Sequence, residues 1–575
     1  MRTDQNLLPQ YSESRRKLYR VLLLFIAGMG GLLYGADIGI IAAALLYVGK
    51  TVSLTLAQES IIVAAVLGGG MISSPFGGIL ADWFGRKKIM ILSGVMFVVS
   101  VVLIVSAQSF VGLFLGRLLQ GMSGGVVAVV VPLYLAETLS AKERGRGTAI
   151  FQFMLTFGIV IAALIGFYFT HEAQATIAAA GHNAKLILLA DNHAWRGMFE
   201  TVIYPGVVFF IGSFFLGESP RWLFRRGREQ QALRELCRIN RPEEAQRELE
   251  EMKLLAREAE RKAGKRESGS LLNRKYIIPF VLACVILTLN QTTGINSVLS
   301  FLVVILKQAG LTPTLATQGD VIVKVLNCVT TLIGVALVDR KGRKFLLKFG
   351  TAGIVLTTLA IGAVFYSFES RAVNVKDHIV RAEQGNSIHL ALNAQTLGVD
   401  LGKHTGSLRV LYNYGGGNRM ATVLTNSSNP ELLISPAGEA HPGKLQIVSA
   451  AYGAVPSTMV GWLVAALLAI YISCYAAGPG VVVWLTLSEL MPTRIRSIGM
   501  GLAMLFNQGG ATLIAAMFLP MVGHYGYASM FIFLGLATVL YFLTATIFLP
   551  ETKGKTLEEI EVYFEGSRNA QRAGL

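Results

Sequence analysis

Long apolar segments recur along the whole chain of 575 residues, and this repetition limits the possible folds more than any other feature. A helix needs about 20 apolar residues to cross the hydrocarbon core of a bilayer. Segments of suitable length occur twelve times, six before a polar stretch at 218–275 and six after it. The predicted membrane-spanning segments are residues 19–48, 59–81, 89–108, 110–136, 147–170, 197–217, 276–306, 321–338, 345–368, 456–487, 497–522 and 525–549.

The composition agrees with a protein surrounded by lipid. Hydrophobic residues make up 53% of the chain and charged residues only 15%, whereas soluble domains carry about 25% charged residues. The net charge of +16 does not by itself indicate a nucleic-acid partner, because nucleic-acid-binding domains gather their basic residues on one face of a soluble fold. The four cysteines have neither disulfide nor zinc spacing. We therefore expect the lipid bilayer as a partner, and no nucleic acid, metal or cofactor.

The spans predict an all-α membrane protein of two six-helix halves. The first half covers residues 1–217 and the second 276–549, with a tail at 550–575. Residues 218–275 are rich in Glu, Arg, Lys and Leu in a helical pattern, so we interpret them as surface helices that join the halves.

A long polar insertion, residues 369–455, interrupts the second half. It contains no cysteine, and its alternating stretches SLRVLYNY and KLQIVSA predict strands. Gly415–Gly417 follow no strand-to-helix pattern, so a turn is favoured over a phosphate-binding loop.

Lysine and arginine predict the orientation, because they concentrate in the cytoplasmic loops of membrane proteins. The short loops after spans two, four, eight and ten hold twelve basic residues, and the short loops on the other side hold four. We therefore expect a multi-pass protein of the cell membrane, with both termini and the linker in the cytosol. The positive charge then forms a basic inner rim that suits an anionic leaflet.

Three histidines recur at intervals of eleven in the predicted outer loop between spans five and six: His171, His182 and His193. On a helix, consecutive members would lie about 16 Å apart, too far for one metal ion. They are interpreted as loop residues.

Charged pairs repeat between the two halves. An Asp precedes an Arg by four positions after spans two and eight, and a Glu precedes an Arg by seven after spans four and ten. Two pseudo-equivalent halves with a site between them are a transporter architecture. The pairs are interpreted as a cytosolic gate that bridges the halves, with helix-end solubilisation as the alternative and Glu218 and Glu551 as possible further members. They are Asp82–Arg86, Glu137–Arg144, Asp339–Arg343 and Glu489–Arg496.

Eight motifs in order along nearly the whole chain resemble the sugar porter family of the major facilitator superfamily. They are ADWFGRKK, GRLLQGMSGG, PLYLAETLSAKERGRG, GESPRWL, NQTTGIN, VDRKGRK, GPGVVVW with SELMPTRIRS, and PETKGKTLEEIE. The resemblance implies the major facilitator fold, a small-molecule sugar as substrate, no enzymatic activity, and alternating access. We expect a monomer.

Asp37 is the only acidic residue deep inside the first span, and Arg117 is alone in the apolar fourth span. A carboxylate there costs about 2.5–3.5 kcal/mol on insertion scales, so it should face a cavity and have a partner. Counted along their helices, the two residues have comparable depth, so we expect them to pair. In proton-coupled sugar porters the residues at these motif positions carry the proton, which is the role that the resemblance implies. A fixed structural ion pair is the alternative.

A neutral sugar requires amide and hydroxyl partners near the midplane, and NQTTGIN supplies Asn290, Gln291 and Asn296. On an unbroken helix these three would diverge, so a break at Gly294 is expected to bring them around one ligand. The resemblance adds four residues to the substrate site: Gln152, Asn327, Trp484 and Asn507. For any one amide the alternative is an interhelical hydrogen bond.

Some positions differ from the family pattern. Asn290 stands where Gln is usual, and Gln508 where Trp is common, so a particular sugar is not predicted. Lys324 lies one turn from Asn327. It is expected to snorkel to the interface beside Asp320, with contact to an acidic sugar as the alternative.

The leading hypothesis is a proton-coupled symporter of a neutral monosaccharide or polyol. The alternatives are a facilitative sugar uniporter and a transporter of an acidic sugar or inositol. A sensor that binds sugar without transporting it is less favoured, because the tail after residue 549 is short.

Overall fold

The computed structural model describes residues 11–181, 183–263, 274–392, 397, 399, 405–425, 431–436, 443–491 and 496–551. Eleven helical segments in these ranges are long and apolar enough to cross a membrane. The last of them holds two crossings, because Gly526 interrupts it with φ 83° and ψ 170°. With residues 499–525 and 527–547 counted separately, the twelve predicted crossings are present.

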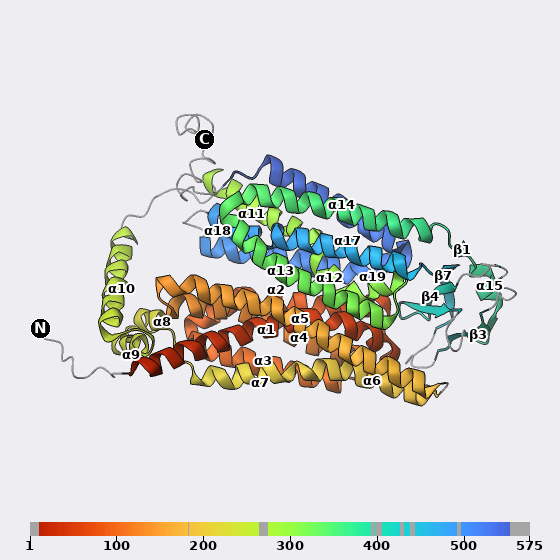
Figure 1. Ribbon diagram of the computed structural model, residues 1–575, viewed down its shortest axis with the longest axis horizontal. Helices are drawn as coiled ribbons and strands as arrows, with labels where there is room; N and C mark the ends of the chain where they lie inside the picture. Colours follow the sequence, from red (N-terminus) through yellow and green to blue (C-terminus); the bar gives the residue numbers. More distant parts are fainter. Residues whose placement is uncertain are drawn as a thin grey trace, which may run out of the picture.

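The two halves lie side by side as separate layers (Figure 1), the first coloured red to yellow and the second green to blue. The first half consists of α1 (Glu13–Thr51), α2 (Leu56–Phe84), α3 (Arg86–Ser106), α4 (Phe110–Thr138), α5 (Ala141–Ala180), α6 (Ala184–Thr201) and α7 (Ile203–Phe215). The linker is helical, as predicted, with α8 (Pro220–Arg225), α9 (Glu229–Ile239) and α10 (Pro242–Ala263). The second half consists of α11 (Arg274–Thr292), α12 (Ile295–Gln308), α13 (Pro313–Lys341), α14 (Arg343–Glu369), α17 (Thr458–Ala477), α18 (Pro479–Leu490) and α19 (Arg496–Ile547).

Many of the long helices begin at a Ser or Thr whose side chain accepts a hydrogen bond from the backbone N–H three residues later. This N-cap satisfies a donor that the helix itself leaves free. The capping residues are Ser12, Thr55, Ser109, Thr312 and Ser457.

The predicted loop between residues 170 and 197 is wrong. α5 continues to Ala180 and α6 begins at Ala184, so nearly the whole region is helical. With 40 residues, α5 is about 60 Å long, twice the roughly 30 Å of a hydrocarbon core. Hydropathy marks only the part of a helix that meets lipid, so the water-facing turns escaped detection.

The insertion forms two antiparallel sheets between α14 and α17, at the end of the bundle opposite the linker helices α8, α9 and α10 (Figure 1). We call this end the insertion end and the other the terminal end. One sheet has the order β1-β7-β4-β5 and the other β2-β3-β6. Its elements are β1 (Val373–Asn374), α15 (Lys376–Arg381), β2 (Glu383–Gln384), β3 (Ser387–Ala391), β4 (Gly406–Asn413), β5 (Asn418–Leu424), β6 (Glu431–Ile434) and β7 (Gln446–Ala454).

Both predicted strands of the insertion are confirmed, and they pair with each other as β4 and β7. The predicted turn at Gly415–Gly417 is also confirmed, because it joins β4 to β5 in a hairpin. Gly415 and Gly417 have φ of 98° and 120°, values that favour glycine.

Among the described residues, the halves touch most extensively through three helix pairs: α2 with α19, α5 with α13, and α1 with α12. At the insertion end, the backbone N–H of Leu519 donates to Ser60 Oγ at 2.9 Å. Nearer the middle, Thr156 Oγ1 lies 3.4 Å from Cys328 Sγ. The halves are therefore in contact both at the insertion end and nearer the middle of the bundle.

Gly294 breaks the seventh crossing between α11 and α12, as predicted, with φ 82° and ψ 11°. A Cβ at this position would lie 2.7 Å from the Leu534 side chain.

We expect Gly294→Ala to destabilise the protein by about 1 kcal/mol or more, because alanine disfavours positive φ. Thermal unfolding of the purified protein measures this. Gly501→Ala is the control, since Gly501 lies within α19 with nothing within 4 Å of its Cβ position; equal losses of stability would contradict the prediction.

Candidate functional site

Three of the predicted amides form one hydrogen-bonded group at the break in the seventh crossing. Asn296 Nδ2 donates to Gln291 Oε1 at 2.8 Å, and Gln291 Nε2 donates to Asn507 Oδ1 at 3.1 Å. Asn507 Nδ2 donates in turn to the backbone carbonyl of Leu287 at 3.1 Å. The break at Gly294, between the two helices of this crossing, brings Asn296 into contact with Gln291. We call Gln291, Asn296 and Asn507 the amide cluster.

The other predicted substrate residues are distributed around this cluster. Asn290 points elsewhere than Gln291, because its Nδ2 donates to the hydroxyl of Tyr475 at 3.1 Å. Asn327 lies on α13 and is 8% exposed, next to the Cys328 that contacts Thr156 of α5. Gln152, one turn before Thr156 on α5, is exposed. The side chain of Trp484 lies outside the described residues.

Two polar contacts near the amide cluster were not anticipated. Tyr475 on α17 orients Asn290, and Gln508 interacts with Tyr34 of α1, across the two halves. Tyrosines in an apolar span are common, so the sequence offered no signal for Tyr475. Gln508 was visible only as a departure from the family pattern.

Asp37 and Arg117 are in contact inside the first half, as expected from their depths. Arg117 Nη1 lies 2.8 Å from Asp37 Oδ1, and both side chains are at most 2% exposed. Arg117 Nη1 also donates to Gln120 Oε1 at 2.7 Å, and its guanidinium lies over the ring of Phe199. The second carboxylate oxygen, Asp37 Oδ2, has no hydrogen-bond partner among the described residues and faces Gly124. Asp37 Oδ1 is therefore paired with the arginine, while Asp37 Oδ2 accepts no hydrogen bond from the described residues.

Lys324 does not snorkel to the interface, and that expectation is wrong. The side chain is fully buried, and its Nζ lies 2.8 Å from Asp320 Oδ2 one turn earlier on α13. The expected proximity to Asp320 is present. Because the ammonium already pairs with a carboxylate, the arrangement gives no support to a contact with an acidic sugar.

The charged residues at the terminal end of the first half form a compact network. Arg86 is 1% exposed and places its guanidinium 2.7 Å from both Asp82 Oδ1 and Glu137 Oε2. Arg225 of α8 adds a second guanidinium to Glu137 at 2.6 Å, and Ser219 Oγ donates to the same carboxylate at 2.6 Å. These contacts join the first half to the linker, through α2, α4 and α8. They do not join the first half to the second.

A carboxylate that caps a helix start is a second feature repeated in both halves. Glu218 accepts from the backbone N–H of Arg86 at 2.9 Å, and Glu551 accepts from that of Arg343 at 3.0 Å. Each carboxylate caps the first turn of a helix, where the dipole favours negative charge. The sequence repeat therefore extends to Glu218 and Glu551. The side chains of Arg144, Asp339, Glu489 and Arg496 lie outside the described residues.

We expect Glu137→Gln to lower the free energy of unfolding by about 3 kcal/mol, because it removes one partner of a buried ion pair. Thermal unfolding in detergent measures the loss. Asp82→Asn is the matched control. The Asp82 side chain is 55% exposed, so the change should cost at most about 1 kcal/mol. A Glu137→Gln protein as stable as this control would contradict the prediction.

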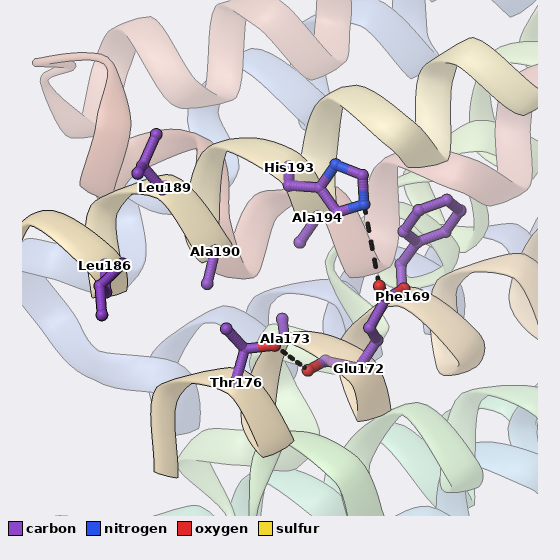
Figure 2. A pocket seen from close by; sticks show the side chains of 9 residues that line it. All are labelled: Phe169, Glu172, Ala173, Thr176, Leu186, Leu189, Ala190, His193 and Ala194. Carbon is purple, nitrogen blue, oxygen red and sulfur yellow. Dashed lines mark hydrogen bonds and ion pairs between the residues drawn. The ribbon is translucent and has the colours of Figure 1, made fainter. Parts of the chain in front are cut away.

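A cavity of about 240 Å³ lies between α5 and α6 near the insertion end (Figure 2). Its walls are mostly apolar, with His193 and Glu172 facing each other across 3.9 Å. None of its lining residues belongs to the amide cluster or to the Asp37–Arg117 pair. His171 and His193 therefore lie on helices α5 and α6 and not in a loop, while His182 lies outside the described residues. This cavity is separate from the predicted substrate residues.

Comparison with known proteins decides the family. The model of the family described as "Sugar (and other) transporter" matches residues 23–380 and 445–564. The chain belongs to the sugar porter family of the major facilitator superfamily. The match leaves out residues 381–444, which lie inside the insertion of this transporter.

Its relatives are transporters rather than enzymes. The galactose-proton symporter of Escherichia coli K12 is 26% identical, over 97% of each chain. The human proton myo-inositol cotransporter is 27% identical, over 97% of this chain and 83% of that protein. Among solved structures, the inward open conformation of the xylose transporter XylE from E. coli aligns with a TM-score of 0.66 at 21% identity, over 95% of this chain and all of the other. The structural likeness supports the fold alone.

Proposed function

We propose that this transporter is a symporter that carries one neutral monosaccharide or polyol together with a proton, by alternating access. The observation that carries the proposal is the buried Asp37–Arg117 pair in the first half, together with the amide cluster in the second. Asp37 Oδ2 is buried and unpartnered among the described residues, so it is the atom proposed to take the proton. Protonation would weaken the ion pair at Oδ1 and free the guanidinium from its charge partner.

The proposed substrate site comprises neutral donors and acceptors only. The amide cluster supplies both kinds of group, which suits the hydroxyls of an uncharged ring. Substrate would replace hydrogen bonds that the amides now make with one another. The remaining proposed ligands are Gln152, Asn290, Asn327 and Trp484, the last offering an apolar face and an indole N–H.

The proposed orientation places the terminal end in the cytosol and the insertion end outside the cell membrane, following the lysine and arginine asymmetry. The halves are in contact at the insertion end, which supports the proposal that this state is closed toward the outside and faces inward. The charged pairs at the terminal end are proposed to join the halves in the opposite, outward-facing state. The transporter is proposed to act as a monomer.

Uptake by proteoliposomes tests the proposal. Labelled galactose, xylose, glucose, myo-inositol and glucuronate are offered with and without an inward proton gradient. At least one neutral ring should accumulate above its external concentration only with the gradient. Myo-inositol is included because a named relative transports it with protons. Equal uptake with and without the gradient would indicate a uniporter, and binding without uptake would indicate a sensor.

A further inference from the structure

A second buried ion pair lies in the other half of the bundle, on α13. Asp320 Oδ2 and Lys324 Nζ are 2.8 Å apart, and their side chains are 1% and 0% exposed. Burial of two charges is costly, and a buried pair is often no more stabilising than apolar residues of the same size. The pair therefore calls for an explanation other than stability.

The ammonium of Lys324 makes a further contact that crosses between the halves. Lys324 Nζ donates to the backbone carbonyl of Gly39 at 3.0 Å. Gly39 belongs to α1, two residues after Asp37. Its missing side chain lets α1 approach α5, since a Cβ there would lie 2.7 Å from the Cβ of Ala162. The ammonium of Lys324 in the second half therefore donates a hydrogen bond to α1 in the first half, toward the insertion end.

We propose that Lys324, oriented by Asp320, is a latch that fastens α13 to α1 and holds the insertion end closed. The inference rests on the alternating access of the proposed function. When the halves separate at this end, the ammonium must release the carbonyl of Gly39, whereas its bond to Asp320 lies within one helix and can persist. Asp320 is a positioning residue: it keeps the charge compensated while the latch is open.

The latch predicts a change in accessibility. A hydrogen bond from a charged donor is strong enough to shift a two-state ratio by about ten- to a hundredfold. Leu519, 5% exposed in the closed contact beside Ser60, reports the state when changed to Cys in a protein whose four native cysteines are replaced. A membrane-impermeant maleimide added from outside should label L519C about tenfold faster or more in the double variant D320N/K324M.

The choice of variants separates a latch from a merely structural pair. D320N/K324M removes both charges together, so no buried charge is left alone, and K324R should keep slow labelling because it retains a charged donor. D320N/K324Q serves if the first double variant does not fold. Unchanged labelling in a folded double variant would overturn the latch. Fast labelling of a protein that transports no sugar would uphold the latch and reject the proposed function.

A different observation carries a second inference, which concerns the insertion. The β4–β5 hairpin touches both halves at once. Arg419 Nη1 donates to Ser53 Oγ at 2.7 Å, between α1 and α2, while Asn418 Nδ2 lies 2.9 Å from Nε2 of His524 on α19. Gly417 rests on Thr55, because a Cβ at Gly417 would lie 3.5 Å from Thr55 Cβ. The hairpin belongs to the segment that the family model leaves out.

We infer that the hairpin is an external clamp across the mouth of the transporter in its inward-facing state. It must leave Ser53 and Thr55 whenever the halves part, since β4 and β5 are attached to the second half. A covalent bond in place of this contact should therefore stop transport.

The pair T55C/G417C tests the clamp, because its Cβ separation of 3.5 Å suits a disulfide. Transport should be lost on oxidation and restored by reduction, with the reduced protein as its own control.

If Cys at the positive φ of residue 417 prevents folding, N418A/R419A provides the alternative. It should speed L519C labelling several-fold, while T422A, on the exposed side of β5, should not. Normal transport by fully cross-linked protein, or unchanged labelling in N418A/R419A, would reject the clamp.

Discussion

Asp37→Asn is expected to abolish concentrative uptake while leaving exchange of labelled for unlabelled sugar intact. Asparagine is close in size to the carboxylic acid, but its amide does not titrate, so it can neither take up and release a proton nor form an ion pair with Arg117. The variant resembles the protonated state permanently, so the sugar-loaded protein can still cross between its two states. Accumulation in proteoliposomes under a proton gradient, compared with counterflow in the same preparation, measures the two activities separately.

Asp191→Asn is the matched control for this prediction. Asp191 is likewise buried, with a side chain 4% exposed, and it pairs with Lys50 at 3.2 Å. It lies away from Arg117, on α6, so its loss should leave accumulation in place. Accumulation by the Asp37→Asn variant at the wild-type level would rule out Asp37 as the proton carrier. A fixed structural pair would instead reduce uptake and exchange together.

Gln291→Ala is expected to weaken sugar binding by about ten- to a hundredfold or more. Gln291 makes two of the hydrogen bonds in the amide cluster, one to Asn296 and one to Asn507. Its removal takes one donor and one acceptor away from the proposed sugar, and a sugar hydroxyl left unpaired in a buried site costs about 1–3 kcal/mol. Equilibrium binding of labelled sugar to the purified protein measures the change, without a contribution from proton coupling.

Thr292→Ala is the control beside it. Thr292 Oγ1 donates to Leu289 of its own helix at 2.9 Å, so its loss should change affinity by less than about twofold. Wild-type affinity in the Gln291→Ala protein would mean that the amide cluster is an interhelical contact and not the substrate site.

The sequence predicted the features that depend on position along a helix. The lengths of the apolar segments located the twelve crossings. Counting residues from the helix ends predicted that Asp37 and Arg117 lie at a similar depth in the membrane. Gly294 was recognisable as a break because the amides around it would otherwise diverge. These inferences succeed because helix geometry is regular, so depth and direction follow from residue number.

Features that depend on packing between helices were not predictable. The direction of Asn290 toward Tyr475 follows from how α11 lies against α17, and no sequence spacing specifies that. The bond from Lys324 to Gly39 joins residues 285 positions apart, and a lysine beside an aspartate in one span gives no sign of it. The extension of α5 was missed for another reason, since water-facing helical turns lack the apolar signal of a membrane span.

Sugar-driven proton movement is the measurement that tests proton-coupled symport most directly. Proteoliposomes with a pH-sensitive dye inside and no imposed gradient receive a neutral sugar that the uptake assay has identified. A symporter acidifies the interior as sugar enters, the Asp37→Asn variant does not, and Asp191→Asn behaves as the wild type. Sugar entry without acidification in the wild-type protein would contradict proton coupling and leave a facilitative uniporter.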